Sequence, residues 1–223
     1  MGWQWGGGWL ATIGFSDFAG STLVHSTGGA AALAGIIILG PRFGRFDSKG
    51  NPKSIQPFAA SSIPLVTIGV FVLWLGWFGF NGGSQLALAS FADAVAISSI
   101  FINTNLAACG GVLAAAIITR LMFGKTDVIQ MLNGAIGGLV AITAEPLAPS
   151  PLAAILIGAT GGVIVVFGTK LLFSFKLDDV VGAIPAHMFA GIFGTLIVPM
   201  TNADATFGAQ LIGVLSINIL VFL

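Results

Sequence analysis

The sequence predicts an all-α polytopic membrane protein with about seven transmembrane helices. Of its 223 residues, 56% are hydrophobic and only 7% are charged, and a soluble domain of this size could not hide so much apolar surface. The apolar residues form long runs, which indicates helices and not a β-barrel. Thirty-two glycines predict close helix packing, for which the pairs Gly134 with Gly138 and Gly158 with Gly162 have the small-xxx-small spacing.

Seven apolar segments follow one another along the chain. We expect helices over residues 17–40, 58–83, 93–122, 128–147, 151–174, 179–199 and 207–223. The stretch before the first segment is rich in tryptophan and glycine and lacks the basic residues of a signal peptide. The single cysteine, Cys109, lies in an apolar run, so no disulfide can form within one chain. We therefore treat residues 1–223 as one membrane domain.

Charged residues end or begin most of these segments and predict their orientation. Every cation lies in or beside the connection that follows the first, third or fifth segment, and the positive-inside rule makes these connections cytoplasmic. The N-terminus of the segment is then outside. Asp93, Glu145 and Asp204 lie on the opposite side, where Glu145 and Pro146 predict an exposed turn after the fourth segment. The cations are Arg42, Arg45, Lys49, Lys53, Arg120, Lys125, Lys170 and Lys176.

Several function classes receive no support from the composition. The formal net charge is zero and no basic patch is present, so nothing predicts a nucleic-acid partner. The sequence shows no nucleophile with a base at a suitable spacing, no metal-spaced cluster and no phosphate-binding loop, which argues against an enzyme, a metal site or a cofactor.

All five tryptophans fall near the predicted outer side, and the simplest interpretation is a belt of interfacial anchors.

One motif occurs twice, 162 positions apart. The pattern D-x2-G-x4-H-x3-G is found at residues 17–29 and again at residues 179–191. It contains His25 and His187, the only two histidines, and each lies within an apolar stretch. An ionisable side chain at membrane depth predicts a functional site, and its duplication predicts a channel or transporter built from repeats.

The two copies are predicted to lie on antiparallel helices, because the first segment enters from outside and the sixth from inside. This arrangement is typical of inverted-topology repeats, whose site lies near the midplane. Asp17 and Asp179 can each cap the helix that they begin. Each histidine follows eight residues later, which is roughly 12 Å along a helix. In a core of roughly 30 Å the two rings then lie within about 6 Å in depth.

Two other interpretations of the histidines remain. They could be packing residues that hydrogen-bond to neighbouring helices. They could also ligate a haem as a bis-histidine pair, although only one pair is present. The neighbouring Asp178 and Asp179 are better interpreted as a helix cap than as a catalytic carboxylate pair.

Three blocks of the sequence resemble the Amt/Mep/Rh ammonium transporter family. The first is DFAGSTLVHSTGG, residues 17–29, and the second is WLGWFGFNGGS, residues 74–84. The third is DDVVGAIPAH, residues 178–187, which resembles the family block with the second pore histidine. The blocks occur in family order, and the resemblance covers almost the whole chain.

The resemblance implies roles at the outer mouth and along the pore. Trp5 and Ser84 would bind ammonium at the outer mouth. Phe80 would be one ring of a phenylalanine gate, and Trp77 would line the pore. Met188, which follows the second histidine, departs from members that carry glycine there.

The resemblance also implies the central and supporting residues. His25 and His187 would be the twin pore histidines, with Asp17 and Asp179 as structural supports. Asn81 follows the gate phenylalanine and could orient it. Ammonia would then pass along a hydrophobic pore after ammonium has been deprotonated at the outer mouth.

At the level of the whole protein, the resemblance implies a homotrimer in the plasma membrane, one pore in each protomer and a PII-type regulator at the cytoplasmic face. Methylammonium would serve as a substrate analogue. Family members have about eleven spans and this chain resembles the fifth to the eleventh, so we expect a domain that is incomplete at both ends. The alternative function is an ammonium-sensing receptor domain coupled to a cytoplasmic signalling module.

Overall fold

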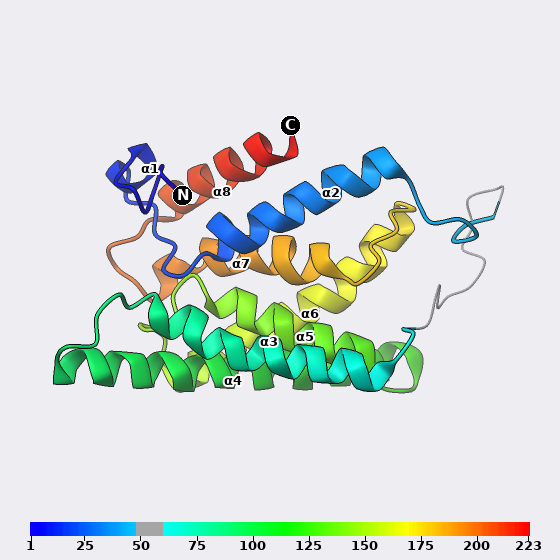
Figure 1. The fold of residues 1–223 in the computed structure, drawn as a ribbon, viewed down its shortest axis with the longest axis horizontal. Helices are drawn as coiled ribbons and strands as arrows, with labels where there is room; N and C mark the ends of the chain where they lie inside the picture. Colours follow the sequence, from blue (N-terminus) through cyan, green and yellow to red (C-terminus); the bar gives the residue numbers. More distant parts are fainter. Residues whose placement is uncertain (48–59) are drawn as a thin grey trace.

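The structure, a computed structural model, describes residues 1–47 and 60–223, which form a bundle of helices aligned along one common direction (Figure 1). Two short π-helical turns, η1 and η2, precede α2 and α7. In chain order the elements are α1 (Trp9–Thr12), η1 (Ser21–Ser26), α2 (Thr27–Leu39), α3 (Ile63–Gly83), α4 (Phe91–Phe123), α5 (Val128–Ile142), α6 (Pro151–Ser174), η2 (Ile184–Phe189), α7 (Ala190–Leu196), the 3₁₀ turn η3 (Val198–Met200) and α8 (Phe207–Phe222).

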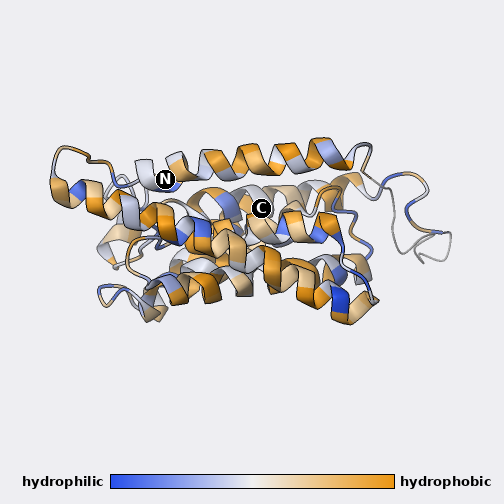
Figure 2. Ribbon diagram, turned by 90° about the horizontal axis from the view of Figure 1, so that it is seen from below, coloured by the Kyte–Doolittle hydropathy of each residue, from blue (hydrophilic) through white to orange (hydrophobic). Residues whose placement is uncertain are grey.

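The all-helical prediction is confirmed, since each of the seven expected segments contains a helix. Residues 58 and 59 of the second segment, together with Lys49 and Lys53, lie outside the described residues. Within the described part, four helical stretches are long and apolar enough to cross a membrane, namely Ser21–Leu39, α3, α4 and α6. Hydrophobic residues run along the helices, and hydrophilic residues concentrate in the connections at the two ends (Figure 2).

The helices begin where the sequence supplies hydrogen-bonding caps. The side chains of five residues accept a hydrogen bond from a backbone N–H three positions later, which satisfies a donor that a helix start leaves free. Before α4 the bond is reciprocal, because the Asp93 carboxylate also accepts from the backbone of Ser90. The five residues are Ser62, Ser90, Asp127, Ser150 and Thr206.

Helices α4, α5 and α6 form the most closely packed part of the bundle, and glycine makes this possible. A side chain at Gly158 of α6 would collide with the backbone of Ala107 on α4. A Cβ atom at Gly134 of α5 would lie 2.6 Å from the Cβ atom of Ala115 on α4. The predicted small-xxx-small packing is therefore confirmed, and it brings the helix backbones into contact.

A second group of helices packs across this three-helix core. The turn η1 packs against α7 and η2 packs against α2, so each of the two duplicated motifs contacts the helix that follows the other. Helix α2 and the η2–α7 segment run side by side in Figure 1. Helix α8 closes this group, and its buried Gln210 accepts from the backbone N–H of Ser16 at 2.8 Å and donates to the carbonyl of Thr195 at 2.8 Å.

The connection after α5 differs from its prediction. Helix α5 ends at Ile142, five residues before the expected limit at 147. The Glu145 side chain is buried and not exposed. Its carboxylate accepts a hydrogen bond from Asn202 Nδ2 at 2.9 Å and another from the backbone N–H of Ala148 at 3.3 Å. The prediction of an exposed turn is therefore wrong, because one neighbouring and one distant polar partner hold the carboxylate in a buried position.

The glycine packing yields a stability prediction. Replacing Gly158→Val places a branched side chain against the Ala107 backbone, so we expect a loss of about 1–3 kcal/mol in the free energy of unfolding. The matched control is Gly69→Val on α3, where a Cβ atom meets no other atom within 4 Å. Thermal unfolding in detergent should show a clear drop for the first variant alone. Equal melting temperatures for both would contradict this account of the core.

Candidate functional site

The two duplicated aspartates organise the start of each histidine-bearing helix. The Asp17 carboxylate is fully buried and accepts four backbone N–H bonds, from Gly20, Ser21, Thr22 and Leu23, at 2.8–3.1 Å. The predicted capping is thereby confirmed, and it is more extensive than a single cap bond.

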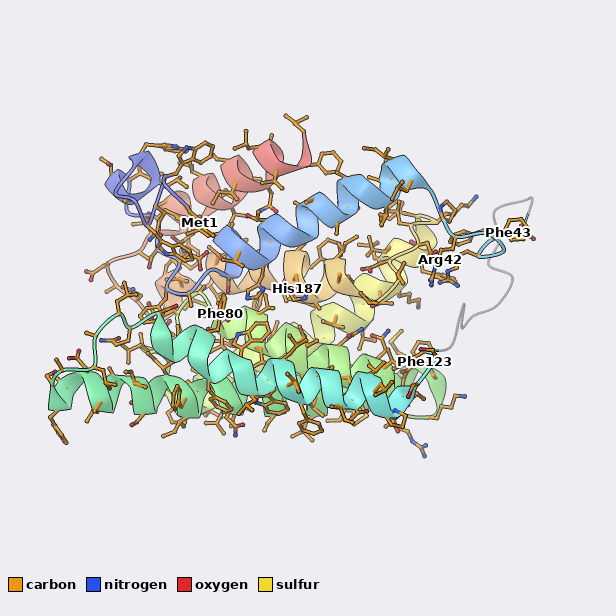
Figure 3. All side chains as sticks on the ribbon, viewed as in Figure 1. Met1, Arg42, Phe43, Phe80, Phe123 and His187 are labelled. Atoms are coloured by element: carbon orange, nitrogen blue, oxygen red, sulfur yellow. The ribbon has the colours of Figure 1, made fainter. Side chains whose placement is uncertain are left out.

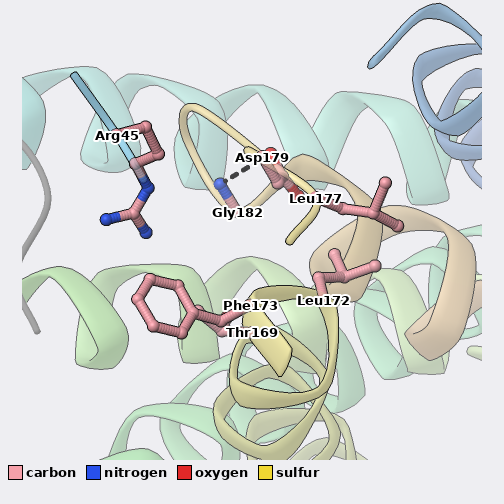
Figure 4. Close-up of a pocket in the computed structure, with 7 residues that line it drawn as sticks. All are labelled: Arg45, Thr169, Leu172, Phe173, Leu177, Asp179 and Gly182. Atoms are coloured by element: carbon pink, nitrogen blue, oxygen red, sulfur yellow. Dashed lines mark hydrogen bonds between the residues drawn. The ribbon is translucent and has the colours of Figure 1, made fainter. Parts of the chain in front are cut away.

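The second copy has the same construction. The Asp179 carboxylate accepts from the backbone N–H groups of Gly182, Ala183 and Ile184 at 2.8–3.0 Å, and Figure 4 shows the bond to Gly182. Asp178 does not take part in this cap, which corrects the interpretation of the two carboxylates as one capping unit.

Local geometry explains why the motif has glycine at these positions. Gly20 and Gly182 follow their aspartates in the left-handed region, with φ of 108° and 76°, where a side chain would be strained. The last glycine of each copy packs against the other copy. A Cβ atom at Gly29 would lie 2.6 Å from the Cβ atom of Met188, and one at Gly191 would collide with the carbonyl of Ser21.

Both histidines lie in π-helical turns, a feature that the sequence did not predict. The backbone N–H of His25 reaches the carbonyl of Gly20 at 3.0 Å, one residue further back than in an α-helix. In the second copy Pro185 lacks an N–H, and the carbonyl of Val181 instead accepts from Asn133 Nδ2 at 2.9 Å. π-helical turns recur at functional sites, but no residue pattern in a single sequence announces them.

The two histidine rings meet, as expected from the mirrored motifs. Their Nδ1 atoms are 3.2 Å apart, and their ring centroids are separated by 5.3 Å with an interplanar angle of 24°. A hydrogen bond at this distance requires one Nδ1 to donate and the other to accept. His187 lies midway along the bundle, between the end marked by Met1 and the end marked by Phe123 (Figure 3).

A hollow of about 240 Å³ adjoins the rings and is lined by Val24, His25, Gly28, Gly29, Ala183 and His187. The Nε2 atom of His25, one of these lining residues, is buried without a hydrogen-bond partner. Buried polar atoms are normally paired, so an unpaired one beside a cavity indicates a place for a polar ligand.

Two aromatic rings also contact His25. Trp77 stacks on it with a centroid distance of 4.9 Å and an interplanar angle of 13°. Phe80 lies 5.4 Å from His25 and 5.9 Å from Trp77. Trp77 is only 5% exposed, so it does not belong to an interfacial belt.

A buried chain of hydrogen bonds holds Trp77 in place. Its Nε1 donates to Thr143 Oγ1 at 2.8 Å, and that hydroxyl lies 3.1 Å from Asn81 Oδ1 and 2.7 Å from the carbonyl of Leu139. Asn81 Nδ2 in turn donates to Thr104 Oγ1 at 3.0 Å. Asn81 therefore supports the tryptophan network, whereas the sequence suggested that it orients Phe80. The two threonines were not predicted, because isolated threonines carry no distinguishing signal in an apolar segment.

The expected outer-mouth residues are each tied to the site through a different partner. Trp5 is 44% exposed, and its Nε1 donates to the backbone carbonyl of Asp17 at 2.9 Å. Ser84 Oγ donates to the carbonyl of Phe80 at 2.8 Å. In the part of the chain that the structure describes, no hydrogen bond or ring contact joins Trp5 to Ser84 directly. The Ser84 oxygen keeps lone pairs available for a further donor.

Asp178 belongs to an ion-pair cluster at the opposite end of the bundle. Arg42 Nε lies 2.7 Å from its carboxylate, and Arg45 Nε lies 3.2 Å from it. The hydrogen bond from Arg42 holds the pKa of the Asp178 carboxyl below its usual value. Within residues 1–47 and 60–223, no group of three or more His, Cys, Asp or Glu side chains could hold a metal ion.

The chain is similar to known proteins in both sequence and structure. The model of the Ammonium Transporter Family matches residues 1–219. The chain is 45% identical over 216 residues to ammonium transporter Amt2 of Archaeoglobus fulgidus, covering 92% of this chain and 44% of that protein. It is 39% identical over 196 residues to Amt1 of the same organism, covering 88% of this chain and 46% of that protein.

Solved structures of similar fold agree with the sequence matches. A structure described as a sensor Amt protein superposes with a TM-score of 0.89 and 34% identity, covering 96% of this chain and 54% of that chain. Candida albicans Mep2 superposes with a TM-score of 0.87 and 29% identity, covering 99% of this chain and 51% of that chain. The chain thus spans about half the length of the relatives that it matches.

The buried network predicts a specific role for one threonine. Thr143→Val keeps the shape but removes the hydroxyl, which leaves Trp77 Nε1 and Asn81 Oδ1 without this partner. We expect a loss of about 1–3 kcal/mol in unfolding free energy. The control is Thr160→Val, because the exposed Thr160 hydroxyl bonds only to its own helix at Leu156. Denaturant unfolding in detergent should separate the two variants, and similar values for both would exclude the network as a source of stability.

Proposed function

The chain belongs to the Ammonium Transporter Family, and from that membership we propose that it supplies the pathway by which ammonium crosses a membrane as ammonia. The observation that carries this proposal is the contact between His25 and His187 beside a hollow with an unpartnered ring nitrogen. The pathway runs from the end that carries Trp5 and Ser84 past Phe80 to the two rings.

The outer mouth binds the cation in this proposal. The exposed face of Trp5 offers a cation–π contact worth about 0.5–2 kcal/mol. The Ser84 hydroxyl donates to the Phe80 carbonyl, so its remaining lone pairs can accept from ammonium. Asp17 supports this mouth indirectly, since its backbone carbonyl holds the Trp5 indole and its carboxylate holds η1.

Free energies favour the crossing of a neutral molecule. Simulated costs of carrying a charge to the bilayer centre reach about 10–17 kcal/mol, and insertion scales give about 2.5–3.5 kcal/mol. Removing the proton from ammonium, whose pKa is about 9, costs about 3 kcal/mol at pH 7. Under the higher charge barrier, deprotonation is the easier route. Potassium has no proton to lose, so the same apolar path rejects it.

The histidine pair suits a neutral nitrogen ligand. Two neutral rings carry two protons, and one of them occupies the hydrogen bond between the Nδ1 atoms. The donor ring then has a bare Nε2 that accepts, and the acceptor ring has a protonated Nε2 that donates. Ammonia both donates and accepts, so it can bind at either ring. The pair can also relay a proton separately from ammonia.

At the level of the whole protein, we propose a multi-pass protein of the plasma membrane with the N-terminus of this segment outside. The chain would form one wall of the pore in a longer protein, and three such protomers would assemble as a homotrimer. A PII-type regulator would bind the cytoplasmic face. The family membership supports these assignments.

A sensory role is the second candidate. The high structural similarity to a sensor Amt protein favours it. The same outer site would then bind ammonium, and occupancy would be signalled to a cytoplasmic module without conduction. Uptake of labelled methylammonium into liposomes separates the candidates, since only a transporter accumulates the label.

Removing either pore histidine tests the central step. His25→Ala or His187→Ala removes one ring of the pair, and we expect ammonium-dependent current of the complete protein to be abolished. Current measured on proteoliposomes, with protein insertion quantified in parallel, checks this result. Thr160→Val serves again as the control with normal current. Wild-type rate and selectivity in either alanine variant would refute the proposed role.

The outer mouth gives a separate prediction. Trp5→Leu removes the cation–π contact, so the methylammonium concentration at half-maximal uptake should rise about 2- to 30-fold. The maximal rate should change less, because the histidine pair remains intact. Concentration series of uptake measure both quantities. An unchanged half-maximal concentration would place the cation site elsewhere.

A further inference from the structure

We propose that Arg42, Arg45 and Asp178 are positioning residues for the pore ring of His187. Arg42 lies at the end of the bundle opposite to Met1, while His187 lies near its middle (Figure 3). Asp178 contacts both Arg42 and Arg45. The effect passes through the backbone from Asp178 to the adjacent Asp179, and from there into the turn η2.

The cluster is a specific ion pair and not a loose surface contact. The Asp178 side chain is 2% exposed, and both of its oxygens accept from the Arg42 guanidinium, from Nε at 2.7 Å and from Nη2 at 2.9 Å. The backbone N–H of Arg42 also donates to it at 3.0 Å. This two-pronged geometry fixes direction as well as distance.

Arg45 adds a second, buried attachment. Its side chain is 6% exposed, and its guanidinium lies 4.4 Å from the ring centroid of Phe173 on α6 and 5.4 Å from that of Phe46. The segment after α2 is therefore joined both to the end of α6 and to the residue before the η2 cap. A cavity of about 30 Å³ separates Arg45 from the turn at Asp179 and Gly182 (Figure 4).

The next link is the cap itself. Asp178 and Asp179 are adjacent, so the backbone that holds one also places the other. Asp179 is bonded to the first three N–H groups of the segment that becomes η2. A shift of Asp178 is thereby transmitted to the turn that carries His187.

The histidine contact is sensitive to such a shift. The Nδ1 atoms are 3.2 Å apart, already near the upper limit for a hydrogen bond, so a further displacement of half an ångström or so would break it. The first motif is attached without an ion pair: Gln210 bonds to both backbone groups of Ser16, the residue before Asp17, and the Asp17 carboxylate bonds only to backbone N–H groups. Arg42, Arg45 and Asp178, which we call the clamp, thus act on one ring of the histidine pair, that of His187.

The ion pair between Arg42 and Asp178 stays charged under the conditions in which transport is measured. Because the pKa of Asp178 is lowered, its ion pair is formed above the ordinary carboxyl pKa of about 4 and is lost only as the pH falls below that value. A variant is therefore needed to remove the clamp, since mild acid does not.

Histidine nitrogen NMR provides a test that does not depend on transport. The chain contains only two histidines, so ¹⁵N-histidine labelling in lipid bilayers gives signals from these two rings alone. In the unsubstituted chain we expect a through-bond coupling between the two Nδ1 atoms. Asp178→Asn, which keeps the size of the side chain, and Arg42→Ala should each reduce this coupling at least twofold.

Two controls separate positioning from general damage. Arg42→Lys keeps the cation and should restore at least part of the coupling lost in Arg42→Ala. Arg120→Ala removes an exposed arginine that bonds only to Gly124 at the C-terminal end of α4, and it should leave the coupling unchanged. An unaltered coupling in both Asp178→Asn and Arg42→Ala would overturn the proposal, as would its absence from the unsubstituted chain.

The proposal rests on the proposed function only for its transport consequence. In the complete protein, Asp178→Asn should lower the maximal rate of methylammonium uptake about tenfold or more, because a small misplacement of the His187 ring slows transfer through the pore. The half-maximal concentration should change little, because the outer binding site is unaltered. If uptake is absent even without substitutions, the transport proposal fails while the NMR result still decides the positioning role. Normal uptake by a variant with a lost coupling would overturn the link between this clamp and the pore.

Discussion

The whole arrangement depends on satisfying backbone N–H groups where two helices begin inside the bundle. Within a membrane an unpaired N–H is expensive, because no water is available to replace a missing partner. Asp17 supplies one carboxylate to four such groups, and Asp179 supplies one to three. The carboxylates thereby set where each turn starts, and that start determines where each histidine points.

The glycine-packed helices and the polar site have complementary roles. Helices α4, α5 and α6 approach closely enough that added side chains would collide, so they form a stable base. Polar side chains from this base then extend toward the site, as Thr143 and Thr104 do for Trp77 and Asn81. The stacked indole covers one face of His25. The ring is therefore oriented by its stacking on Trp77 and by its contact with His187 before any ligand arrives.

Much of this could be predicted from periodic apolar runs and from one repeated pattern. The runs located the helices to within a few residues where strong end signals exist, as at α6, which matches its predicted limits of 151–174. The repeat predicted that His25 and His187 would meet, because matching offsets on antiparallel helices end at similar depth. Asp17 and Asp179 were predictable as caps because acidic residues favour helix starts.

Other features required three-dimensional information. A single sequence cannot show that Thr143 lies opposite Trp77, since 66 positions separate them and nothing distinguishes this threonine from others in apolar segments. The π-helical turns depend on the exact backbone path beside Gly20 and Gly182, which local propensity does not specify. Glu145 was expected to be exposed because Glu145 and Pro146 indicate a turn, and the sequence does not show that Asn202, 57 positions away, becomes its partner.

The reciprocal packing at the end of each motif limits how the two halves of the site can diverge. Gly29 accommodates Met188 from the other copy, and Gly191 accommodates Ser21. A larger residue at either glycine would push away the turn that carries the opposite imidazole. A larger side chain at either glycine therefore requires a compensating change in the other copy, which couples the two motifs at these positions.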